Sequence, residues 1–383
     1  MERLQLTLLA VLVTACDAHT STWRLTSHVP SDPAGFSNAL YQSAHVALKP
    51  GHRVELVNNG AVFDRLEQSF VKAQRSINIV LFIWRPGRLS ERLVNALAAS
   101  VKRGVTCRVL VDPIPSEDFE ASVKPSLAGA GCEVRAFRPL KQGATIERNH
   151  RKIVVIDGEV GVTGGFGVDD SWLGDGKKPD EWREASVIVE GSAVNELQQA
   201  FADNWQEAGG ALLPATDFPV ARERGPTLAG FVSSTASDHL TRAERLMQLL
   251  IASATTRVWI ANAYFVPSEG LIALLVEKRK QGVDVRVMAP GDQTDNPTVL
   301  AEQRATYKAL RAGGVRLWEY QPSVLHSKTM LVDEHLSVVG SINLDWLSMA
   351  ALEEGSLVMS DPRVVAELVT SWEADVALCV EVP

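Results

Sequence analysis

The sequence has few cysteines, no long hydrophobic run and no excess of positive charge, and each absence excludes a class of protein. Its four cysteines (16, 107, 132 and 379 of 383 residues) lack metal-like spacing, which argues against a zinc framework and a disulfide-rich scaffold. The longest apolar stretch, Leu4 to Val13, has about ten residues and is too short to span a bilayer. A formal net charge of -8 argues against a broad basic surface for nucleic acid.

The N-terminal segment has the features of an export signal. The apolar run follows Arg3 and ends in Val13-Thr14-Ala15-Cys16, where small residues precede a cysteine. We therefore expect residues 1–16 to be a signal peptide whose lipobox-like Cys16 carries a lipid anchor, at a bacterial cell membrane and facing the periplasm or the outside. A short buried helix is the alternative. Residues 17–50 are polar and predict a tether.

The rest of the chain is an internal repeat. His150 and Asp157 recur as His326 and Asp333, a shift of 176 residues, whereas Gly131 recurs as Gly314, a shift of 183. The first half therefore carries seven extra residues just before its histidine. Insertions of this kind usually form loops over a site.

Within each half, helical periods alternate with short Val/Ile-rich runs, which is the pattern of an α/β sheet flanked by helices. We predict two duplicated α/β/α sandwich domains, residues 51–215 and 227–383, related by pseudo-twofold symmetry. Function is expected at one active site on their interface.

Each half carries one copy of the spaced triplet His-x-Lys-x4-Asp. The residues after each lysine predict a strand, in which side chains two apart share a face, so the histidine and lysine point the same way. Any one of these residues is more often structural, but two copies at equivalent points of a repeat have no shared packing rationale. We predict that the catalytic group contains His150, Lys152, Asp157, His326, Lys328 and Asp333.

Two imidazoles and two ammonium groups suit a phosphodiester substrate. One neutral histidine can attack phosphorus and hold a covalent phosphohistidine, while the second, protonated, donates to the leaving alkoxide. Lys152 and Lys328 would neutralise the non-bridging oxygens. This chemistry needs no metal, and the sequence offers no Asp/Glu/His cluster for one, so we expect no cofactor.

At these residues the chain resembles the phospholipase D superfamily, whose signature is this duplicated motif followed by a Gly-Gly/Ser-x-Asn element. The element is intact at residues 340–343 and reads Gly-Gly-Phe-Gly in the first half, where Gly167 replaces the usual asparagine. The resemblance implies that the substrate phosphate is bound by Lys152, Lys328, Gly165, Ser341 and Asn343.

The family also uses a downstream acid to orient each histidine through its other ring nitrogen. Glu184 lies 34 residues after His150, and Glu354 lies 28 residues after His326. The resemblance implies that these two glutamates are the orienting acids. A solvated surface charge is the alternative for each.

The wider match, from about Val54 to Trp372, is closest to bacterial cardiolipin synthases of the phospholipase D type. It implies a phosphatidyltransferase that joins two phosphatidylglycerol molecules into cardiolipin and releases glycerol. Hydrolysis to phosphatidic acid uses the same residues and stays open, as do a phosphodiesterase or nuclease and a non-catalytic lipid-binding lipoprotein. We expect a phospholipid substrate, a membrane surface reached through the lipid anchor, no nucleic acid, and a monomer.

Six aromatic residues lie close to these motifs and suit a lipid headgroup interface, although packing of the domain seam is their commoner role. They are Trp84, Trp172, Trp182, Tyr264, Phe265 and Trp346. Cys107 and Cys132 each open a predicted strand, and we expect two buried thiols rather than a disulfide.

Overall fold

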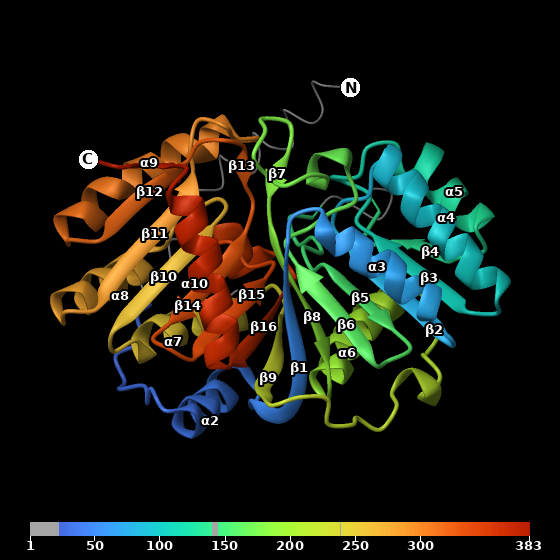
Figure 1. Cartoon of the computed structure of the whole chain (residues 1–383), viewed down its shortest axis with the longest axis horizontal. Helices are drawn as coiled ribbons and strands as arrows, with labels where there is room; N and C mark the ends of the chain where they lie inside the picture. The colour runs from blue at the N-terminus through green and yellow to red at the C-terminus, as the bar shows by residue number, and fades with distance from the viewer. Residues whose placement is uncertain (1–22, 140–144, 238) are drawn as a thin grey trace.

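The computed structural model describes residues 23–139, 145–237 and 239–383 (Figure 1). The expected signal peptide, Cys16 and the first residues of the expected tether lie outside these ranges. Within the described ranges, no helix is long and apolar enough to cross a membrane.

The first half of the chain supplies seven strands of one large sheet, a short strand outside it, and the helices that cover it. Its elements are β1 (Lys49–Asn58), α3 (Ala61–Lys72), β2 (Ser76–Leu81), α4 (Arg88–Lys102), β3 (Thr106–Val111), η1 (Phe119–Val123), α5 (Lys124–Gly129), β4 (Glu133–Ala136), β5 (Ile153–Ile156), β6 (Val160–Gly164), η3 (Asp170–Trp172), β7 (Trp182–Arg183), β8 (Ala185–Glu190) and α6 (Ala193–Glu207).

The second half repeats this order after a linker that holds η4 (Ala215–Asp217). Its elements are β9 (Thr227–Ser234), α7 (Arg242–Ser253), β10 (Arg257–Asn262), α8 (Glu269–Lys280), β11 (Asp284–Pro290), α9 (Pro297–Ala312), β12 (Arg316–Tyr320), β13 (Val324–Leu325), β14 (Lys328–Val332), β15 (Leu336–Gly340), η5 (Leu347–Ala351), β16 (Glu354–Ser360), α10 (Pro362–Val376) and β17 (Cys379–Glu381).

The strands of the two halves join into one sheet, and its order confirms the repeat. In the described residues the sheet has 15 strands in the order β17-β12-β11-β10-β14-β15-β16-β9-β1-β8-β6-β5-β2-β3-β4. Read outward from the β9–β1 contact, the second half runs 9-16-15-14-10-11-12 and the first half runs 1-8-6-5-2-3-4. Equivalent strands therefore occupy equivalent places, as the predicted duplication requires.

A glycine in the left-handed conformation follows each of two equivalent helices of the repeat. Helix α4 ends at Lys102 and helix α8 at Lys280, and Gly104 and Gly282 follow with φ of +93° and +91°. A residue with a Cβ atom is strained in this left-handed conformation. Both glycines turn the chain directly into the next strand of the sheet.

Helices α6 and α10 connect the halves through a shared core. Helix α6 of the first half contacts β9 of the second, and α10 of the second half contacts β1 of the first. Figure 1 shows α10 crossing the face of the second half of the sheet. The buried cluster between these helices and the sheet includes Phe201, Trp205, Trp318, Leu368 and Trp372. Each half also has one further buried hydrophobic cluster.

The prediction of a polar tether over residues 17–50 is wrong for its second part. Helix α2 (Pro33–Ala44) begins with Asp32, whose side chain accepts a hydrogen bond from the Gly35 backbone N–H. Its residues Phe36 and Leu40 are fully buried against α7. The few apolar residues of this polar stretch lie on one side of a helix, and the second domain provides the surface that buries them.

The prediction of two free thiols at Cys107 and Cys132 is also wrong. The two sulfur atoms form a disulfide that links β3 to the residue before β4. Because β3 and β4 are parallel neighbours in the sheet, equivalent points of these two strands lie close together. The sequence predicted both strands but not that they pair.

Candidate active site

His150 lies just before β5, in the interior of the molecule, and pairs with a glutamate of the other half. The residue is 4% exposed, and its Nδ1 lies 2.8 Å from Oε1 of Glu354. The ring of Phe82 packs edge-on against the imidazole at 4.9 Å between centroids. Nδ1–H donates to the carboxylate, which leaves the Nε2 lone pair free.

His326 has the equivalent environment before β14. It is 5% exposed, and its Nδ1 lies 2.7 Å from Oε2 of Glu184, a residue of the first half. Trp172, Trp182 and Tyr264 surround the imidazole, with ring centroids at 5.4, 4.7 and 6.1 Å. Three of the six aromatic residues near the motifs therefore line this half of the site.

Backbone pairing fixes this crosswise arrangement. The residue before each histidine forms a parallel bridge with the residue before the opposite glutamate: Asn149 with Glu353, and Leu325 with Arg183. The amide N–H of each histidine donates to the same opposite residue, at 2.8 Å in both cases. Each glutamate therefore follows the histidine of its own half in sequence and contacts the histidine of the other half.

The two predicted lysines are buried beside the histidines. Lys152 Nζ donates to the His150 carbonyl at 2.6 Å, and Lys328 Nζ donates to the His326 carbonyl at 2.5 Å. Burial lowers the pKa of Lys328 to about 8, although Glu184 and Glu354 favour its charged form. Burial also lowers the pKa of Lys152. The charge of Glu354 opposes this decrease, and repulsion from Lys328 adds to it. The site thus buries two lysine amines, and the nearby carboxylates favour their charged forms.

The two orienting carboxylates differ in how firmly they hold a negative charge. Burial tends to raise the pKa of Glu354, but hydrogen bonds and charges from His150, Lys152 and Ser341 bring it below its usual range. Burial raises the pKa of Glu184 to about 6, because its partners offset less of the cost. The halves are therefore alike in backbone and unequal in electrostatics.

The predicted aspartates lie at the far ends of their strands from the histidines. Asp157 accepts from the backbone N–H groups of Gln74, Arg75 and Ser76 at 2.6–2.9 Å. Asp333 accepts equivalently from Thr255, Thr256 and Arg257 at 2.7–3.0 Å. In both halves the carboxylate thus fastens the start of a neighbouring strand.

Gly165 and Ser341, predicted to bind phosphate, lie against the carboxylates of Glu184 and Glu354. A Cβ atom at Gly165 would lie 2.5 Å from Oε2 of Glu184, so this position makes room for the glutamate. The Ser341 hydroxyl donates to Glu354. Asn343 is 3% exposed, and its Oδ1 has no hydrogen-bond partner among the described residues, which keeps it a candidate for phosphate binding.

Sequence reasoning missed the buried charge network around Glu353. Its carboxylate lies 2.9 Å from Arg151 and 3.1 Å from Arg138, and it accepts a hydrogen bond from Asn204. All three partners belong to the first half of the chain. The repeat contains a signal for this network, because charged residues of opposite sign, Arg183 and Glu353, stand at equivalent positions. Each forms an ion pair with the other half, and Arg183 lies 2.8 Å from Asp375.

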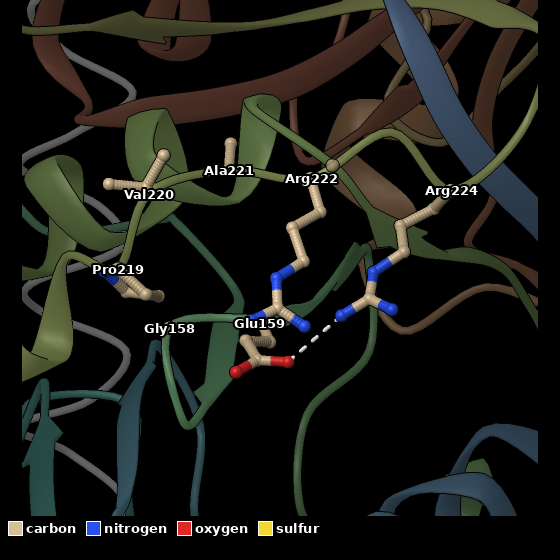
Figure 2. A pocket seen from close by; sticks show the side chains of 8 residues that line it. Gly158, Glu159, Pro219, Val220, Ala221, Arg222 and Arg224 are labelled. Atoms are coloured by element: carbon tan, nitrogen blue, oxygen red, sulfur yellow. Dashed lines mark hydrogen bonds and ion pairs between the residues drawn. The ribbon is translucent and has the colours of Figure 1, made fainter.

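A surface pocket beside the linker is separate from this site. Figure 2 shows Arg222 and Arg224 extending toward Glu159, with Arg224 Nη2 3.0 Å from a Glu159 oxygen. The pocket borders Gly158, in the turn after β5, whereas His150 and Lys152 precede that strand. Within the described ranges, no group of three or more His, Cys, Asp or Glu residues is placed to hold a metal ion.

Comparisons with known proteins identify one family for both halves of the chain. A family model described as "Cardiolipin synthase, PLD-like domain" matches residues 66–205 and 247–376. Cardiolipin synthase A of Pseudomonas fluorescens is 34% identical over 333 residues, covering 85% of this chain and 69% of that protein. Cardiolipin synthase of Geobacillus kaustophilus is 31% identical over 311 residues, covering 78% and 62%. The chain thus spans about two thirds of the length of these relatives.

A solved structure shows that the fold extends over the whole sheet. Phosphatidylserine synthase of Haemophilus influenzae superposes with a TM-score of 0.69 at 12% identity, covering 91% of this chain and 92% of that one. At this identity the likeness establishes the α/β fold alone. The family model, which covers both halves, assigns the chain to the phospholipase D-like family of cardiolipin synthase domains.

Proposed function

We propose that this protein is a phosphatidyltransferase of the cardiolipin synthase type, which converts two phosphatidylglycerol molecules into cardiolipin and glycerol. The observation that carries the proposal is the pair of buried histidines, each held by a glutamate of the other half and flanked by a lysine. The relatives named cardiolipin synthase support the choice of lipid.

In the first step, Nε2 of His150 attacks phosphorus, and the bond from phosphorus to the glycerol oxygen breaks. His326 gives its proton to the departing oxygen, and glycerol leaves. In the second step, the hydroxyl of another phosphatidylglycerol attacks phosphorus and returns a proton to His326. The phosphorus–nitrogen bond then breaks, which releases cardiolipin and restores both histidines.

The more firmly ionised Glu354 supports His150 as the nucleophile. Burial lowers the pKa of His150 to about 4 despite the opposing charge of Glu354, so its imidazole is neutral at neutral pH. Glu354 accepts hydrogen bonds from Ser341 and Ser348 as well as from His150, and it stabilises the positive charge that grows on the ring during attack.

His326 needs the substrate to become an acid. Burial, Lys328 and Lys152 hold its pKa well below the usual range in the empty site. A bound phosphodiester carries one negative charge and offsets the two ammonium groups, so it favours the protonated imidazole. The general acid is then formed where the leaving oxygen lies.

The Cys107–Cys132 disulfide supports export, since disulfides persist in oxidising compartments. We therefore propose that the enzyme lies at the outer side of a bacterial cell membrane, held by an acylated Cys16.

The test uses purified full-length protein with phosphatidylglycerol vesicles. We expect cardiolipin and glycerol in equal amounts, and a loss of at least about a thousandfold in His150→Asn. His28→Asn, at an exposed position, is the matched control and keeps full activity. Phosphatidic acid as the main product would assign hydrolysis instead. No turnover of intact vesicles by the wild type would reject the proposal.

A further inference from the structure

Gly167, the departure from the family element, opens a space that a tryptophan fills. A Cβ atom at Gly167 would lie 3.0 Å from Cη2 and Cζ3 of Trp172 and 3.1 Å from Cβ of Ile83. The backbone of Gly167 does not adopt the left-handed conformation that requires glycine. Crowding by the indole therefore explains the glycine, and an asparagine side chain would displace this ring.

Trp172 reaches the reacting groups from η3. It is 2% exposed, and its Nε1–H points to Oε2 of Glu184 at 3.4 Å. The same oxygen accepts the Nδ1–H of His326 at 2.7 Å. The indole also packs edge-on against the imidazole and lies 4.3 Å from the ring of Trp182, which covers a second side of His326.

The second half holds its glutamate in a different way. Two hydroxyl groups, of Ser341 and Ser348, donate to Glu354. In the first half Gly165 stands in the place of Ser341 and offers no hydroxyl. Among the described residues of the first half, the Trp172 indole is the one side-chain donor to Glu184, and the Ala185 backbone N–H at 2.9 Å is a further donor.

We propose that Trp172 is a positioning residue, which fills the space left by Gly167 and orients Glu184 and thereby His326. The inference rests on the proposed phosphodiester chemistry of His326 and deepens it. The indole N–H of Trp172 donates to Glu184, the glutamate that contacts His326. In the second half, the hydroxyls of Ser341 and Ser348 donate to Glu354 in the same way.

The charges facing Glu184 define the expected pH effect. His326 and Lys328 face it from the second half and Lys152 from the first, while Arg183 is engaged by Asp375. Burial raises the pKa of Glu184 to about 6, and the Trp172 hydrogen bond opposes that rise. Removing the indole N–H therefore raises the pKa further. The ionised form is then lost at a higher pH.

The test compares Trp172→Phe with Trp259→Phe, a control that removes an indole–carboxylate hydrogen bond to Asp284 outside the site. We expect Trp172→Phe to shift the acid limb of kcat/KM upward and to lower activity roughly threefold to tenfold at pH 6, with a smaller loss at pH 8. The control keeps the wild-type pH profile. Melting temperatures of both variants separate loss of stability from loss of positioning.

A milder variant covers the case in which Trp172→Phe folds poorly. Gly167→Ala presses a methyl group on the indole and moves the acid limb in the same direction, whereas Gly129→Ala, whose Cβ meets nothing within 4 Å, does not. An unchanged acid limb in a folded Trp172→Phe or Gly167→Ala protein overturns the inference. If the wild type processes no phosphodiester, the proposed function fails, and NMR titration of His326 in these variants still decides the positioning role.

Discussion

Oε1 of Glu354, in the second half of the chain, lies 2.8 Å from Nδ1 of His150, in the first half. Glu184 and His326 form the reciprocal pair at 2.7 Å. Neither half therefore contains a complete histidine–carboxylate pair of its own. The site exists only when the two halves pack together, which couples catalysis to the shared core under α6 and α10.

The crosswise pairing predicts which histidine responds to which glutamate. Glu354→Gln removes the carboxylate that favours the protonated form of His150, so the pKa of His150 falls below its value of about 4. The imidazole signals of His150 shift in this variant and those of His326 shift in Glu184→Gln, as measured by NMR with assigned histidines. The opposite pattern would mean that each half pairs its own residues.

We expect kcat/KM, which reports the ionisation of the free enzyme, to follow a bell-shaped pH profile. Glu184 must be ionised, which sets an acid limb near pH 6, and Lys328 must be charged, which sets an alkaline limb near pH 8. Activity falls as the pH drops below the first value and as it rises above the second. Lys328→Arg keeps its charge at high pH, so the alkaline limb of kcat/KM moves upward even where the maximum rate is lower. An unmoved limb would assign it to another group.

The Glu353–Arg151 ion pair is expected to carry much of the stability at the interface. Both side chains are buried, so Glu353→Gln leaves the Arg151 charge poorly compensated and costs about 3 kcal/mol of unfolding free energy. Glu120→Gln, in the exposed pair with Lys124, costs no more than about 1 kcal/mol. Denaturant unfolding of both variants measures the difference, and equal losses would contradict this role.

Asp333 is expected to act on stability and not on catalysis. Asp333→Ala leaves several backbone N–H groups without their acceptor and costs about 2–4 kcal/mol, while the rate per folded molecule at pH 7 stays close to wild type. Burial alone would raise the pKa of Asp333, but these hydrogen bonds hold it below its usual value. Its stabilisation is thus present above the unfolded pKa of about 3.9 and is lost as the pH falls through the lower folded value. A rate loss like that of His150→Asn would return Asp333 to the catalytic group.

The disulfide closes a loop of sequence separation 25 and is expected to stabilise the fold by roughly 3 kcal/mol. A Cys107→Ala/Cys132→Ala variant, or the reduced protein, then unfolds at lower denaturant concentration with an active site of unchanged pH profile. Free thiols in protein purified from the bacterial envelope would contradict both the disulfide and the proposed export.

The sequence by itself determined the duplication, the α/β class and the four cationic or imidazole residues of the site. Periodicity and the recurring His-x-Lys spacing are local features, and strand geometry alone places His150 and Lys152 on one face. The same local rules could not separate Asp157 and Asp333 from this group, because a residue at the end of a strand has a role set by its neighbour in the sheet.

Only the tertiary structure decided which glutamate serves which histidine. In the sequence, Glu184 follows His150 in the same half, which suggests that these two residues pair. In the structure, parallel bridges between the halves bring Glu184 to His326. Likewise, the packing of α2 on α7 and the disulfide between β3 and its neighbour depend on segments that meet only after folding. All three have the same physical reason. Burial and hydrogen bonding stabilise residues that are close in space, whatever their separation along the chain. Chain separation changes only the entropic cost of bringing them together, and that cost grows slowly with loop length.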